Sequence, residues 1–124
     1  MTAAVPILIV DDNPTNIKLL EFILQQRGYD VRVAGNAEEA LTSIADHKPR
    51  LILMDIQLPG VDGLTLTRHL KADPATKDIA IIAATAYAMK GDEERALAAG
   101  CDGYLTKPID TRKLPNDIAR FLAS

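Results

Sequence analysis

The sequence is short of cysteine. Cys101 is the one thiol in a chain of 124 residues, so no disulfide can form within the chain. A single unpaired cysteine is typical of proteins from a reducing compartment. Cys101 stands just before an apolar run at 103–106, and we expect its side chain to be a small buried filler and not a nucleophile.

Basic clusters and long apolar runs are also missing. The formal net charge is −3, and no Lys/Arg cluster resembles the surface of a DNA-reading protein. No apolar run approaches the roughly 20 residues of a membrane span. The first residues, "MTAAVP", lack the basic region and apolar stretch of a signal peptide. We therefore expect a soluble, cytoplasmic protein that binds neither nucleic acid nor membrane.

What the sequence does have is a regular alternation. Apolar strand-like runs lie at 7–10, 29–34, 51–54, 79–85 and 103–106. A helical pattern follows each run, which predicts a (βα)5 chain with a parallel sheet covered by helices on both faces. The expected fold is flavodoxin-like and doubly wound, with strand order 2-1-3-4-5. The length suits a single domain over residues 1–124, with no output domain.

Several residues predict where the helices begin. Asn13, followed by proline, has the features of an N-cap with proline in the first turn. The fourth helical pattern begins at Ala88, and Gly91 weakens its start. Pro115 falls where the last helix should run, and proline in a helix interior costs about 3 kcal/mol. We therefore expect that helix to start late, with Pro115 in its first turn.

The second helix carries a second capping signal. Asn36 and Glu39, three residues apart, resemble a capping box. The apolar spacing that follows predicts that Ala40, Leu41 and Ile44 face the core.

Polar side chains stand where four of the strands end. Asp11 and Asp12 follow the first strand, Asp55 the third, Thr85 the fourth and Lys107 the fifth. Parallel strands bring their carboxyl ends to one edge, so these residues should meet there. Three crowded carboxylates repel, so either some stay protonated or a cation joins them. Oxygen ligands on an open, solvent-facing rim suit Mg²⁺.

This combination is suited to phosphoryl transfer. A divalent metal and a lysine draw charge from the moving phosphoryl oxygens, and a carboxylate can accept phosphorus as an acyl phosphate. Asp55 is the best nucleophile candidate because it stands alone after a fully apolar strand. The adjacent Asp11 and Asp12 are better suited to holding a metal.

The motifs "ILIVDDN", "LILMDIQLPGVDG", "AATA" and "YLTKP" resemble the receiver domain of two-component response regulators, over almost the whole chain. "LILMDIQLP" and "AMKGDEER" are most similar to stand-alone receivers of cell-division control. The resemblance implies a signalling domain that catalyses only its own phosphorylation and dephosphorylation. Its partners would be a sensor histidine kinase or a histidine phosphotransfer protein, and a downstream protein.

The resemblance also implies roles for individual residues. It assigns Mg²⁺ to four oxygen donors, from Asp11, Asp12, the phosphoacceptor Asp55 and the backbone carbonyl of Gln57. It assigns the phosphoryl oxygens to Lys107 and Thr85. Thr85 and Tyr104 would move inward together and so change the surface of the fourth helix, fifth strand and fifth helix. Gln57 and Tyr87 would set the lifetime of the phosphorylated form. A late start of the last helix would make the partner-facing surface differ from that of typical members.

Three alternatives remain at this point. A metal-dependent phosphatase with an aspartyl nucleophile would need a second Asp where Gln57 stands. A flavodoxin-like cofactor binder would need a Ser/Thr/Gly-rich phosphate loop, whereas Asp11 and Asp12 begin that loop and repel phosphate. A receiver-shaped scaffold that is never phosphorylated is opposed by the intact set of Asp55, Thr85 and Lys107.

Overall fold

The computed structural model describes residues 4–56, 63–85, 91–106 and 109–123. Its strands are β1 (Pro6–Val10), β2 (Asp30–Ala34), β3 (Leu51–Asp55), β4 (Ala80–Thr85) and β5 (Gly103–Thr106). Its helices are α1 (Pro14–Gln26), α2 (Ala37–Asp46), α3 (Gly63–Ala72), α4 (Asp92–Ala99) and α5 (Leu114–Ala123). Among the described residues, no helix is long and apolar enough to cross a bilayer.

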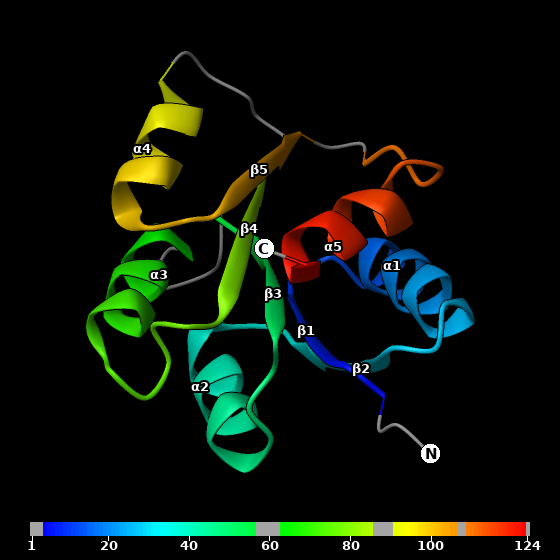
Figure 1. The fold of residues 1–124 in the computed structure, drawn as a ribbon, viewed down its shortest axis with the longest axis horizontal. Coiled ribbons are helices and arrows are strands. Elements are labelled where there is room, and N and C mark those ends of the chain that lie inside the picture. The colour runs from blue at the N-terminus through cyan, green and yellow to red at the C-terminus, as the bar shows by residue number, and fades with distance from the viewer. Residues whose placement is uncertain (1–3, 57–62, 86–90, 107–108, 124) are drawn as a thin grey trace.

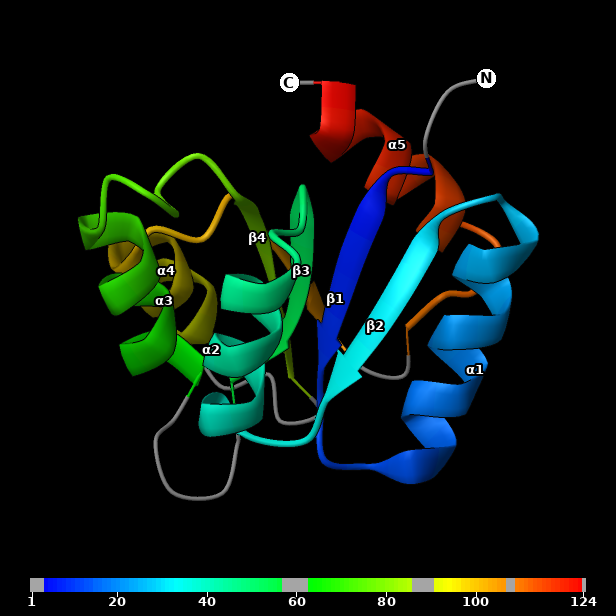
Figure 2. The ribbon, with the colours of Figure 1, turned by 90° about the horizontal axis from the view of Figure 1, so that it is seen from below.

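The strands form one parallel sheet in the order β2-β1-β3-β4-β5. α1 and α5 cover one face, and α2, α3 and α4 cover the other (Figure 1; Figure 2). The predicted fold class, strand order and helical layers are confirmed.

The central strands are apolar on both sides because each face has its own core. Leu8, Ile52 and Met54 belong to the cluster beneath α2, α3 and α4. Ile9 and Leu53, one residue further along their strands, belong to the cluster beneath α1 and α5. Successive side chains of a strand point to opposite faces, so continuous apolar runs supply both cores.

The predicted helix starts agree with the structure at α1 and α5. The Asn13 side chain caps α1 by accepting from the backbone N–H groups of Thr15 and Asn16, at 3.0 and 3.2 Å. α5 begins at Leu114, with Pro115 buried in its first turn. The missing N–H of Pro115 is therefore harmless, because the first turn of a helix has no internal partner for it.

The fourth helix begins later than predicted. Gly91 precedes α4 with φ of 91°, in the left-handed region that glycine adopts at little cost. The helix therefore cannot run through Gly91, and residues 88–90 lie outside the described residues.

The prediction for Leu41 was wrong. Its side chain is 47 % exposed, whereas Ala37, Ala40 and Ile44 are buried. Those three residues follow the i, i+3, i+7 spacing of one helix face, and Leu41 lies about 100° around the helix from Ala40. The predicted capping signal is confirmed, since Asn36 Oδ1 accepts from the Glu39 N–H at 2.8 Å.

Candidate functional site

Three carboxylates meet at the carboxyl edge of the sheet, as the sequence predicted. Asp11 and Asp12 follow β1, and Asp55 is the last residue of β3, the strand beside it. One oxygen from each of the three residues lies within 4.8 Å of the others. The structure thus brings together side chains that are more than 40 residues apart in the sequence.

The expectation of an open, solvent-facing rim was right for only one of these side chains. Asp12 is exposed, but Asp11 is 3 % and Asp55 6 % exposed. Asp55 is enclosed because its strand lies between β1 and β4, with the start of α3 packed against its backbone. The site therefore combines one exposed carboxylate, that of Asp12, with two that are largely shielded from water, those of Asp11 and Asp55.

The Asp11 carboxylate is held in place by α1. Its Oδ1 accepts the backbone N–H of Asn13 at 2.9 Å, and its Oδ2 accepts from the side-chain Nδ2 of Asn16 at 2.8 Å. Sequence reasoning identified Asn13 as a cap but missed Asn16. The sequence did contain a signal for Asn16: it is a second amide side chain in the first turn of a helix that follows an acidic pair.

Gly63 is a second residue that sequence reasoning missed. Its N–H donates to the Ile56 carbonyl at 3.2 Å. A Cβ at Gly63 would collide with the carbonyl oxygen of Asp55 and with the Cα of Ile56. Only glycine lets α3 start against the end of β3, so Gly63 fixes the backbone from which the Asp55 side chain projects.

Thr85 and Tyr104 share one face of the sheet. Thr85 is fully buried at the end of β4, and Tyr104 stands opposite Ala83 in β5. Residues 83 and 85 point to the same side because the strand period is two. Tyr104 is half-buried and packs on the core that contains Ala96 of α4.

Other predicted site residues lie outside the described residues. These are Gln57, Tyr87 and Lys107. Their assigned roles stay predictions.

The donor set fits a hard divalent cation. Three carboxylates within a few ångströms repel one another strongly unless protons or a cation offset the charge. Carboxylate oxygens are the ligands that Mg²⁺ takes from proteins, and it keeps several waters beside them, for which the exposed Asp12 leaves room. The N-terminus of α1 follows directly, and the positive end of its dipole favours the ionised form of the carboxylates that would bind the cation.

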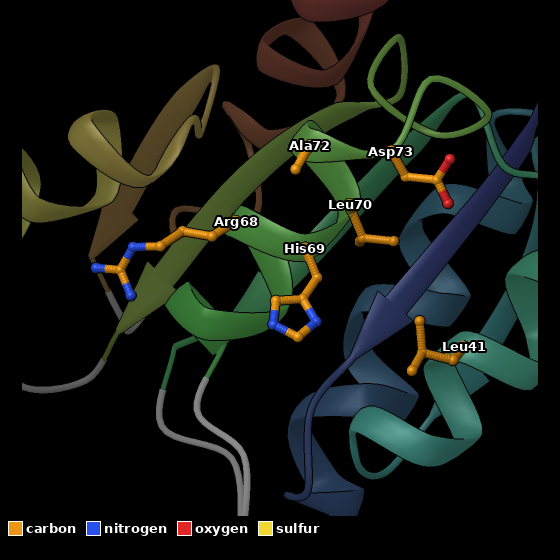
Figure 3. Close-up of a pocket in the computed structure, with 6 residues that line it drawn as sticks. All are labelled: Leu41, Arg68, His69, Leu70, Ala72 and Asp73. Carbon is orange, nitrogen blue, oxygen red and sulfur yellow. The ribbon is translucent and has the colours of Figure 1, made fainter.

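A separate groove lies between α2 and α3 (Figure 3). Its volume is about 620 Å³, and its lining residues are Leu41, Arg68, His69, Leu70, Ala72 and Asp73. It lies along the C-terminal half of α3, whereas the N-terminal residue Gly63 contacts Asp55. None of the three clustered aspartates lines it, so the groove is distinct from the acidic site.

Comparison with known proteins identifies the family. Residues 7–119 match the response regulator receiver domain. The chain therefore belongs to the response regulator receiver family, in which phosphorylation-driven signalling is typical. Receiver domains are signalling domains, so this membership favours a signalling role over the phosphatase and the flavodoxin-like cofactor binder.

The chain is similar to stand-alone members of the family. It is 45 % identical over 116 residues to the polar-differentiation response regulator DivK of Brucella anthropi, covering 94 % of both chains. The crystal structure of a putative response regulator from Chloroflexus aurantiacus has a TM-score of 0.92 and 36 % identity, covering 98 % of this chain and 99 % of that one.

A solved relative carries a metal. The receiver domain of sensor histidine kinase PA1611 from Pseudomonas aeruginosa has a magnesium ion coordinated in its active-site cleft. It is 37 % identical to this chain, with a TM-score of 0.88, and the match covers 98 % of this chain and 100 % of that one.

Proposed function

We propose that this protein is a phosphorylation-controlled signalling receiver whose phosphoacceptor is Asp55. The observation that carries the proposal is the cluster of Asp11, Asp12 and Asp55, with oxygens within 4.8 Å of one another. The donor would be a phosphohistidine of a sensor histidine kinase or a histidine phosphotransfer protein. In the step, an Asp55 oxygen bonds to phosphorus as the phosphorus–nitrogen bond breaks, and the electron pair leaves with the imidazole, which takes up a proton.

Asp11 and Asp12, with Asp55 and the carbonyl of Gln57, would hold Mg²⁺ in this proposal. The bound ion supplies positive charge that offsets the phosphoryl oxygens and the crowded carboxylates. Asp11 and Asp12 would each supply a carboxylate oxygen to the metal, which would leave one Asp55 oxygen for phosphorus. Lys107 would neutralise a further phosphoryl oxygen.

The same proposal explains how phosphorylation would change the surface that a downstream protein contacts. Thr85 donates its hydroxyl to a phosphoryl oxygen, and Tyr104 follows into the space that Thr85 leaves. The shared face of Thr85 and Tyr104, with Ala96 of α4 in the same core, supports a link to α4 and β5. The proposal extends the changed surface to α5, which packs on the other face of the sheet. The signal then leaves by contact with a downstream protein.

Phosphorylation by acetyl phosphate tests the proposal. With Mg²⁺ present, the intact mass should rise by one phosphoryl group in an acid-stable, alkali-labile form, and Asp55→Ala should stay unlabelled. Omitting Mg²⁺ should abolish the labelling. If the wild type stays unlabelled with Mg²⁺ present, the protein is a scaffold of receiver shape. Thr85→Ala should still be labelled but should lose the amide chemical-shift changes in α4 and β5, whereas wild-type-like shifts would contradict the switch.

A further inference from the structure

One contact at the site, between Asn16 and Asp11, plays no part in the proposed function. The Asn16 Nδ2 donates to Asp11 Oδ2 at 2.8 Å, while the Asn13 N–H donates to the other oxygen at 2.9 Å. The two donors come from different parts of the α1 start, one from the backbone and one from a side chain. Together they fix both the position and the rotation of a carboxylate that is 3 % exposed.

We propose that Asn16 is a positioning residue that sets the magnesium affinity of the site through Asp11. This inference rests on the proposed function, because it concerns the metal that the three aspartates would hold. A carboxylate oxygen has two lone pairs, so Asp11 can accept from Asn16 and still offer an oxygen to a cation. Hydrogen-bond partners of ligating carboxylates typically account for 10–100-fold in metal affinity.

A purely structural role for Asn16 makes a different prediction. The backbone N–H of Asn16 is already capped by the Asn13 side chain at 3.2 Å, so the start of α1 does not depend on the Asn16 side chain. Leucine has nearly the shape of asparagine and a higher helix propensity. Asn16→Leu therefore removes the donor to Asp11 without weakening the helix.

The test is a titration of the full chain with Mg²⁺ alone, in which amide chemical shifts report binding. Thermal unfolding of each metal-free variant is measured in parallel. Asn16→Leu should raise the Kd for Mg²⁺ about tenfold, with only the small fall in the unfolding midpoint that one lost hydrogen bond to a shielded carboxylate brings. Asn116→Leu makes the same chemical change in the first turn of α5 and should leave the Kd as in the wild type. Asn16→Gln, which keeps the amide donor, should recover part of the affinity.

The outcomes separate the two proposals. A wild-type Kd in Asn16→Leu, or a weakening shared equally by Asn116→Leu, overturns the role of Asn16 and leaves the metal site standing. Weaker Mg²⁺ binding in Asn16→Leu that comes with amide chemical-shift changes throughout the metal-free chain also overturns it, because the effect would then be structural. If the wild type itself shows no Mg²⁺ binding, the magnesium site of the proposed function fails.

Discussion

Gly63, at the start of α3, packs directly against the backbone of Asp55, at the end of β3, and this contact leaves no room for a side chain at position 63. Gly63→Ala forces a methyl group against the Asp55 carbonyl and the Ile56 Cα. Overpacking of this kind costs about 1–3 kcal/mol. We expect chemical denaturation to show a loss in that range, together with slower labelling by acetyl phosphate because the Asp55 side chain is displaced.

Gly28 provides the control for Gly63→Ala. No atom lies within 4 Å of a Cβ built at Gly28, although its φ of 84° disfavours alanine. Gly28→Ala should therefore reduce stability through backbone strain while leaving the labelling rate of folded protein unchanged. Equal labelling rates in the two variants would contradict a role for Gly63 in holding Asp55.

Two lysine–aspartate pairs of similar length should differ in strength. Lys71 Nζ donates to Asp102 Oδ2 at 2.9 Å and to the Ile79 carbonyl at 2.8 Å, and its side chain is 19 % exposed. Lys71→Met removes the ammonium donor from the Ile79 carbonyl and from Asp102 Oδ2, which keeps the Ile81 N–H at 2.8 Å. We expect a loss of about 1–3 kcal/mol in the free energy of unfolding, measured by urea denaturation.

The pair of Lys48 and Asp78 serves as the comparison. Its 2.8 Å contact joins side chains that are 46 % and 69 % exposed. Solvent screens such a pair, so Lys48→Met should change the free energy of unfolding by about 0–1 kcal/mol. If both methionine variants lost the same stability, burial would not be what makes the Lys71 contact strong.

The Cys101 thiol should be unreactive in the folded protein. Burial raises the pKa of the Cys101 thiol above its ordinary value of 9.0, with a smaller opposing effect from Thr67. The thiolate is the reactive form, so alkylation by iodoacetamide near neutral pH should be slow when native and fast in denaturant. Because the unfolded thiol deprotonates first, this group's contribution to stability should fall as pH rises above 9.0. Rapid native alkylation would show that the thiol is accessible.

Tyr87 is predicted to slow the loss of the phosphoryl group by restricting the approach of water to Asp55. Tyr87→Ala should shorten the lifetime of the phosphorylated form several-fold, as followed by intact mass after removal of acetyl phosphate. Phe22→Ala, which removes an exposed aromatic ring of α1, is the control and should keep the wild-type lifetime. An unchanged lifetime in Tyr87→Ala would remove the basis for this role.

The sequence predicted what depends on local patterns and on topology. The five-fold alternation specifies a parallel sheet, and a parallel sheet forces Asp12 and Asp55 to one edge. The exposure of Leu41 could not be predicted, because helical spacing alone allows a wide apolar face. In the structure, α2 buries two alanines and turns the leucine toward α3. Asn16 and Gly63 were missed for a related reason, since their importance lies in contacts made only after the chain folds.

The most direct test of the central claim is the position of the phosphoryl group. Borohydride reduction converts an aspartyl phosphate to homoserine, which peptide mass spectrometry can locate. After treatment with acetyl phosphate and Mg²⁺, we predict homoserine at position 55 and at neither 11 nor 12. Homoserine at position 11 or 12, or none at position 55, would contradict the account.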